Sequence, residues 1–121
     1  MKDAFESCIQ VQHKSIFLCS KKKAFKKLLV QRGYKPNEVK FLSKGSTATT
    51  YSMKNDVFVC VSDLSKYDDS SIAAILCHEA VHVYQDVMEH IHEDAPGVEM
   101  QAYAIQDIFY RLHKSYMLHH K

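Results

Sequence analysis

The sequence predicts an α+β fold, and three observations carry this prediction. Residues 39–61 are rich in β-branched and aromatic side chains and are interrupted by two short polar breaks, which is typical of an antiparallel sheet. Two stretches beyond residue 70 repeat apolar residues at helical spacing, and a third such stretch, residues 21–33, precedes the strand-rich region. The expected order is helix, small antiparallel sheet, helix, helix. The length of 121 residues fits one domain, spanning residues 1–121.

The composition narrows the class of protein. Hydrophobic residues make up 46% and charged residues 25% of the chain, a globular composition that argues against a disordered or fibrous protein. The longest apolar runs, such as 57–61, are too short to span a bilayer, and the first residues lack the apolar segment of a secretory signal. The four cysteines are expected to be reduced thiols. These features predict a cytoplasmic protein without a membrane partner.

The first helix is predicted over residues 21–33. Its apolar residues recur at helical spacing, Ser20 is a candidate N-cap and Gly33 a candidate C-terminal stop. Five of its residues are lysines, and residues 1–50 carry a net charge of +8 against −6 for the rest of the chain. The lysines are interpreted as a solvated helix face. Nucleic acid is an unlikely partner because the lysine face of this helix lacks the arginines and aromatic residues typical of nucleic-acid sites, although a polyanion site stays open as the alternative.

The sheet is predicted from short runs of strand-forming residues. Three of them follow the first helix: Val39–Leu42, Thr47–Met53 and Val57–Val61. Their short polar breaks favour an antiparallel meander. Ile16–Cys19 is a possible further short strand, whereas residues 3–12 fit a short helix and irregular chain equally well.

Two longer helices complete the domain. The first is expected over residues 72–89, with acidic and hydroxyl capping groups at residues 68–71. The second is expected over residues 98–118, after Pro96-Gly97. Its predicted buried stripe steps alternately by four and three residues and comprises Val98, Ala102, Ile105, Phe109, Leu112 and Tyr116.

The residues that carry chemistry lie in the middle of the first of these helices. His78 and His82 stand four residues apart, so both imidazoles project from one face, one turn apart, and can reach one metal ion. Glu79 lies about 100° around the helix axis from His78, beside the pair, where a general base for a metal-activated water would sit. Cys77 is expected to point toward the core. Without a metal, the same pattern describes two surface histidines that flank a glutamate.

A catalytic zinc site needs a third protein ligand, and Glu99 is the preferred candidate. It lies at the start of the last helix, which could return across the first after the turn at Pro96-Gly97. A first-turn glutamate that only favours the helix dipole is the alternative for this residue. Rival ligands lie in or before the connecting turn: His90, His92, Glu93 and Asp94.

The motif His78-Glu79-Ala80-Val81-His82, followed by Glu99-Met100-Gln101-Ala102-Tyr103, resembles the gluzincin arrangement of zinc metallopeptidases. The longer sequence around both motifs, roughly residues 70–110, is similar to that of small zincin-like proteins encoded by tailed bacteriophages and prophages. The resemblance implies a minimal zincin-like domain whose C-terminal helix bears the third ligand. For a phage-encoded protein it also implies the host cytoplasm. Many gluzincins have an aspartate where this chain has Tyr103, which leaves the support of a metal histidine in question.

The function expected on this basis is that of a zinc-dependent peptidase with one Zn²⁺ per chain, held by His78, His82 and Glu99. Glu79 would act as general base while the metal activates the attacking water. Tyr103 is the first candidate for stabilising the oxyanion, ahead of Tyr84 and Tyr110. A peptide substrate could pair with a strand edge near 57–61 or 47–51.

The competing hypothesis is a catalytically silent, zinc-stabilised interaction protein. In that case the metal serves the structure and the lysine-rich helix binds a protein or nucleic-acid partner. Glu79 separates the two hypotheses, because a purely structural metal site needs no base beside it.

Overall fold

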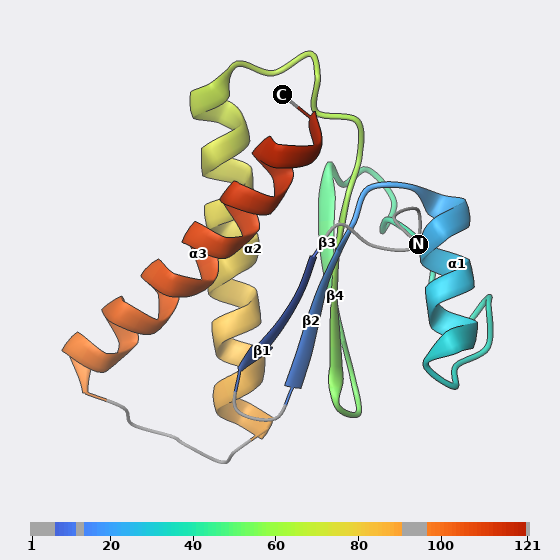
Figure 1. Ribbon diagram of the computed structural model, residues 1–121, viewed down its shortest axis with the longest axis horizontal. Helices are drawn as coiled ribbons and strands as arrows, with labels where there is room; N and C mark the ends of the chain where they lie inside the picture. The colour runs from blue at the N-terminus through green and yellow to red at the C-terminus, as the bar shows by residue number, and fades with distance from the viewer. Residues whose placement is uncertain (1–6, 12–13, 91–96, 121) are drawn as a thin grey trace.

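The computed structural model describes residues 7–11, 14–90 and 97–120 and has an α+β fold, as predicted (Figure 1). Three helices accompany one mixed sheet of four strands in this part of the chain. No described helix combines the length and the apolar composition that a membrane crossing requires. The elements in chain order are β1 (Ser7–Val11), β2 (Lys14–Cys19), α1 (Lys22–Gln31), β3 (Ala48–Met53), β4 (Asp56–Val61), α2 (Asp69–His90) and α3 (Val98–His120).

The sheet has the strand order β1-β2-β4-β3. β1 and β2 are antiparallel, as are β3 and β4, but the central pair β2 and β4 is parallel, with Phe17 opposite Phe58. The prediction of a purely antiparallel sheet is therefore wrong. The reason is that α1 lies between β2 and the later strands in the sequence and acts as a crossover, which parallel neighbours require.

The core has two compartments, one on each face of the sheet. All residues of β2 and β4 are buried, whereas β3, at the edge, is mostly half-buried. Alternate residues of β2 and β4 point to opposite faces, so that Ile16 and Val57 pack with α2 and α3, whereas Phe17 and Phe58 face α1. α2 and α3 thus cover one face and α1 the other (Figure 1).

The predicted first helix is confirmed as α1, with a different start and the expected end. Lys21 occupies the N-cap position and makes no side-chain capping hydrogen bond, so Ser20 is not the cap. At the other end Gly33 has a φ of +90°, and its N–H donates to the Val30 carbonyl while that of Tyr34 donates to the Leu29 carbonyl. This Schellman arrangement needs a residue that tolerates positive φ, which explains the glycine.

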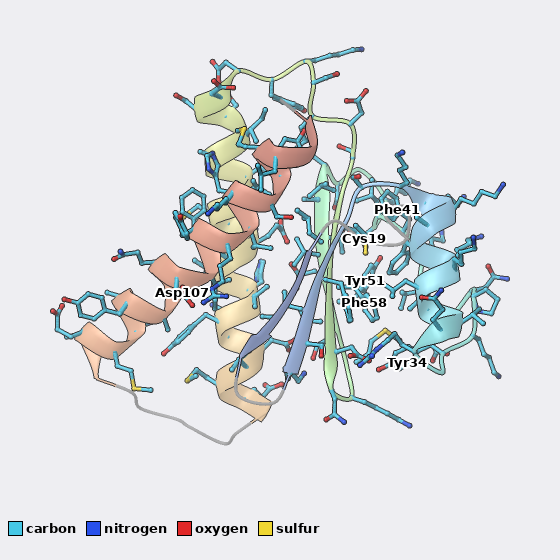
Figure 2. The ribbon with its side chains drawn as sticks, in the orientation of Figure 1. Cys19, Tyr34, Phe41, Tyr51, Phe58 and Asp107 are labelled. Atoms are coloured by element: carbon cyan, nitrogen blue, oxygen red, sulfur yellow. The ribbon has the colours of Figure 1, made fainter. Side chains whose placement is uncertain are left out.

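The run Val39–Leu42, predicted as a strand, lies outside the sheet in irregular, bent chain. Val39, Phe41 and Leu42 are partly buried and pack on the cluster between the sheet and α1 (Figure 2). The Phe41 ring lies 5.7 Å from that of Phe25, centroid to centroid. The apolar side chains of this run therefore cover the part of the core between the sheet and α1. The same character in the sequence cannot distinguish a cover from a strand.

α3 confirms the predicted last helix but corrects its buried stripe. Leu112 and Tyr116 are buried, as expected, together with Ile108. Val98, by contrast, is 80% exposed and Ala102 is exposed. The first turns of α3 extend away from α2 (Figure 1), so helical spacing continues there without a surface to pack against.

A buried carboxylate joins α1 to the start of β4. Asp56 is 4% exposed and accepts hydrogen bonds from the Arg32 guanidinium and from the Tyr34 hydroxyl, both at 2.8 Å. Burial of the phenol and its hydrogen bond to Asp56 raise the pKa of Tyr34 from 10.0 to about 12. The neutral phenol is thus favoured by folding.

This cluster predicts a specific pH dependence of the free energy of unfolding. A group whose pKa is raised on folding stabilises the protein fully below its unfolded-state pKa and loses that contribution as the pH rises through the folded-state pKa. Tyr34→Phe should therefore lower the free energy of unfolding by about 1.5–3 kcal/mol at neutral pH, the range for hydrogen bonds to charged groups. The difference from wild type should shrink between about pH 10 and pH 12. Urea denaturation across this range measures it, and the more exposed Tyr67→Phe is the control. A difference that stays constant up to pH 12 contradicts the assignment.

Candidate functional site

The helix α2 presents the candidate site residues because its own core stripe fixes its rotation. The Asp68 carboxylate accepts a hydrogen bond from the Ser71 N–H at 2.7 Å, which caps the helix and lowers the pKa of Asp68. Ile72, Leu76 and Ala80 are at most 1% exposed and lie against the sheet. The adjoining face, which carries His78 and His82, is left exposed to solvent.

The two histidines converge at their Nε2 atoms, which lie 3.2 Å apart. Their ring centroids are 4.8 Å apart and the ring planes are inclined by 76°. Two nitrogens bound tetrahedrally to one zinc ion at about 2.0–2.1 Å are separated by about 3.3 Å. The pair therefore fits two corners of a tetrahedral zinc site with little adjustment.

Gln85 orients one member of this pair. The Nδ1 of His82 lies 3.2 Å from the Gln85 side-chain oxygen, an acceptor, and this contact favours the tautomer in which Nδ1 carries the proton. The Nε2 atom of His82 then has a free lone pair directed at His78. Hydrogen bonding at the remote nitrogen is the usual way in which proteins orient metal-binding histidines.

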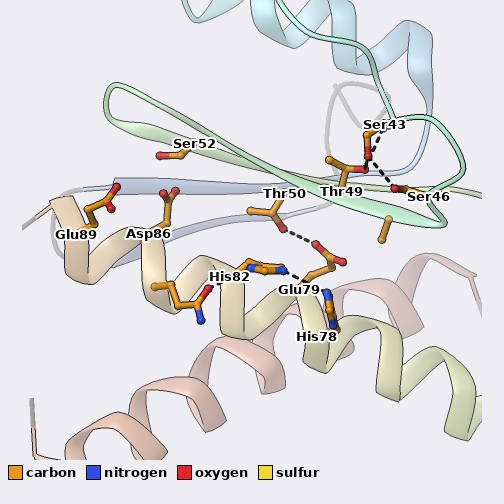
Figure 3. A pocket seen from close by; sticks show the side chains of 12 residues that line it. Ser43, Ser46, Thr49, Thr50, Ser52, His78, Glu79, His82, Asp86 and Glu89 are labelled. Carbon is orange, nitrogen blue, oxygen red and sulfur yellow. Dashed lines mark hydrogen bonds between the residues drawn. The ribbon is translucent and has the colours of Figure 1, made fainter.

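Glu79 is buried beside the pair. It is 5% exposed, and its Oε1 accepts a hydrogen bond of 2.6 Å from the hydroxyl of Thr50 on β3 (Figure 3). The short bond is typical of a hydroxyl that donates to a carboxylate. α2 and the edge strand β3 are thus linked directly at the position of the carboxylate.

These residues share one cleft of about 440 Å³ between α2 and β3. One wall comes from α2, and the opposite wall is rich in hydroxyl groups from β3 and the preceding loop (Figure 3). Its lining side chains belong to Ser43, Ser46, Ala48, Thr49, Thr50, Ser52, His78, Glu79, His82, Gln85, Asp86 and Glu89. The cleft is accordingly polar, and the end marked by Asp86 and Glu89 is acidic.

Lys14 forms a buried ion pair at this acidic end, which the sequence analysis missed. It is 3% exposed, and its ammonium donates to the Ser52 hydroxyl at 3.0 Å and lies 3.8 Å from the Asp86 carboxylate. A lysine that precedes an apolar strand gives no sequence signal of burial. Its partners become apparent only once β2, β3 and α2 are assembled.

The other predicted site residues lie elsewhere. Glu99 is exposed in the first turn of α3, which points away from α2 (Figure 1). Tyr103 is 65% exposed and lines a separate hollow on the outer side of α3, together with Tyr110. Tyr84 is buried and does not line the cleft. The structure thus brings together three of the five predicted residues.

Two further predictions concern Cys77 and the rival metal ligands. Cys77, expected in the core, is exposed, because the buried face of α2 at this level is only as wide as the stripe through Leu76 and Ala80. Of the rival ligands, the side chain of His90 and residues 91–96, which include His92, Glu93 and Asp94, lie outside the described part of the chain.

Comparison with known proteins finds no matching family model, no matching curated protein and no matching solved structure. Within the described residues, moreover, no group of three or more histidine, cysteine, aspartate or glutamate side chains is placed to hold a metal ion. The assignment to the gluzincins and to the zincin-like proteins of bacteriophages is therefore wrong. His-Glu-x-x-His requires only one exposed helix face, whereas a family assignment requires the third ligand that tertiary structure must supply.

The link between α2 and β3 can be tested by its effect on stability. Thr50→Val keeps the shape of the side chain but leaves the buried Glu79 carboxylate without the hydroxyl. It should lower the free energy of unfolding by about 1–3 kcal/mol, as expected for a buried acceptor that loses its donor. Thr50→Ser, which retains the hydroxyl, is the matched control. Equal stability of the valine variant and wild type in urea denaturation would show that the hydrogen bond is not formed in solution.

Proposed function

We propose that this protein is a zinc-dependent hydrolase that cleaves peptide bonds, with one Zn²⁺ per chain. The observation that carries the proposal is the meeting of the His78 and His82 Nε2 atoms, 3.2 Å apart, in the same cleft as the buried carboxylate of Glu79. Neutral imidazole nitrogens are good zinc ligands. A carboxylate that is buried next to them without being a ligand is suited to act as a base.

In the proposed reaction, Glu79 transfers the proton and Thr50 positions Glu79. Zinc, when bound, supplies a Lewis acid that makes water nucleophilic near neutral pH. Thr50 holds Oε1 of Glu79, so we assign Oε2 as the atom that accepts the proton when the water oxygen attacks the peptide carbonyl carbon. Glu79 then delivers this proton to the amide nitrogen as the carbon–nitrogen bond breaks. The products are a carboxylic acid and an amine.

The metal ligands in this proposal are His78 and His82. Glu99 is not included, because the first turn of α3 points away from the histidines (Figure 1). Since a catalytic zinc site ordinarily has three protein ligands, the sequence rivals His90 and His92 are the variants to examine for a third donor.

The edge strand β3 is suited to bind the peptide backbone. It is the last strand of the sheet and forms one wall of the cleft, so an extended peptide can add to its free edge. β4, the other strand considered from the sequence, is paired on both sides, with β2 and with β3, and offers no edge. Main-chain pairing with β3 would lay a peptide past Glu79 and the two histidines.

The second candidate function is a zinc-stabilised interaction protein. A hollow of about 660 Å³ between α1 and residues 37–42 favours an anionic partner. Lys22, Lys26 and Lys40 line it above an apolar floor that includes Phe41, and no acidic residue is among the described lining side chains. Under this alternative the histidines would bind zinc without turnover.

Zinc binding is the first test of the proposal. Isothermal titration of the metal-free protein should give one zinc per chain, and His78→Ala or His82→Ala should abolish stoichiometric binding because each removes a ligand. Gln85→Ala should weaken binding by about 10–100-fold, the usual effect of removing the group that orients a metal-binding histidine. Cys77→Ser and Glu99→Ala are matched controls that should retain binding. Unchanged affinity in both histidine variants refutes the site.

Loss of the base is the second test. Glu79→Gln keeps the side-chain oxygen for the Thr50 hydroxyl, so zinc content and melting temperature should stay near those of wild type. Cleavage should fall by about 10²–10⁴-fold, the contribution of a general base. Mass spectrometry of a diverse peptide library incubated with zinc-loaded protein measures it. If the wild-type protein leaves every peptide intact yet binds zinc, the peptidase proposal fails and the interaction protein is favoured.

A further inference from the structure

α3 carries most of the large hydrophobic side chains that are exposed in the described residues. Five of the seven large hydrophobic side chains that are exposed there belong to α3: Val98, Met100, Tyr103, Tyr110 and Leu118. Among them Tyr103 and Tyr110, two turns apart, share the outer face of the helix and line one hollow, and adjoining exposed apolar groups of this kind mark interaction sites. None of them lines the cleft between α2 and β3, so this surface is separate from the candidate site.

Tyr103 and Tyr110 belong to a continuous stripe opposite the buried side of the helix. Glu99, Tyr103, Gln106, Tyr110 and His113 step alternately by four and three residues, which keeps them on one face. Ile108 and Leu112, on the other side, are buried against the body of the protein. A hollow of about 520 Å³ lies along this stripe, and its lining includes both tyrosines.

We propose that a second copy of this chain packs on this stripe, with the two α3 helices antiparallel and related by a two-fold axis between Gln106 and Asp107. In this register Tyr103 faces the partner's Tyr110, and Glu99 faces the partner's Lys114. Two-fold symmetry repeats each pair, so the interface contains two aromatic pairs and two ion pairs. A self-complementary surface of this kind needs no other partner.

The position of the charges selects this arrangement over its alternatives. A parallel pair would set each charge of the stripe against its own copy, which is unfavourable. A shift of the antiparallel register by one turn in one direction would place Tyr103 opposite the partner's Lys114 and leave Glu99 without a basic partner. A shift by one turn in the other direction would place Glu99 opposite the partner's Arg111, which already pairs with Asp107 at 3.1 Å, and would set Tyr103 against the partner's Asp107. The Lys114 ammonium already lies over the Tyr110 ring, 5.5 Å from its centroid, and is thereby held on the outer face.

Charge reversal tests the register as well as the dimer. Sedimentation velocity over a wide range of concentrations should show a monomer–dimer equilibrium for wild type. Glu99→Lys and Lys114→Glu should each weaken the homodimer by about 10–30-fold, because two exposed pairs turn from attractive to repulsive. An equimolar mixture of the two variants should regain the affinity, since each chain then meets its complement at both positions.

Two controls complete the experiment. Gln101→Lys adds a charge on an exposed residue outside the stripe and should leave the dimer unchanged, and circular dichroism verifies that each variant is folded. A monomeric wild type at every concentration overturns the proposal. A dimer that neither reversal weakens, or a mixture that fails to regain affinity, also overturns it. The outcome is independent of zinc binding and turnover, so it is separate from any failure of the proposed function.

Discussion

The packing of α2 on the sheet is the constraint on which the rest of the structure depends. Its stripe of Ile72, Leu76 and Ala80 lies against the apolar face of β2 and β4, and this burial sets the rotation of the helix about its own axis. Burial of a large aliphatic side chain contributes about 1.5–3 kcal/mol, so a rotation that exposed the stripe would cost far more than any polar contact could recover. His78 and Glu79 therefore face the cleft as a consequence of core packing.

The hydrogen bond between Glu79 and Thr50 fixes the carboxylate in the cleft that the packing of α2 creates. A buried carboxylate is costly unless it is hydrogen-bonded, and the Thr50 hydroxyl supplies that bond from the neighbouring strand. The carboxylate is thus held in a buried position next to two histidines that converge on one point.

Local patterns could be read from the sequence, whereas positions set by tertiary structure could not. Helical spacing and capping groups predicted α2, and the i, i+4 rule placed His78 and His82 together, because both depend only on one helix. The parallel pairing of β2 with β4 and the burial of Lys14 depend on how distant elements meet. The prediction of Glu99 as a metal ligand depended on tertiary structure in the same way. It required the start of α3 to return across α2, and the structure does not place it there.

The divergence of α3 from α2 accounts for two observations that otherwise look unrelated. One side of α3 is buried from Ile108 onward, and its earlier turns project beyond the body of the domain (Figures 1 and 2). That projection keeps Glu99 away from the histidines, and it also leaves Tyr103 and its neighbours uncovered. A helix that continued along α2 would have brought the glutamate toward the cleft, whereas the tyrosines lie on the opposite side of α3 from Ile108 and Leu112. Since the body of the domain packs only on the opposite side of α3, a surface that covers Tyr103 and Tyr110 must lie outside the domain, and its own symmetric copy is the surface whose charges fit.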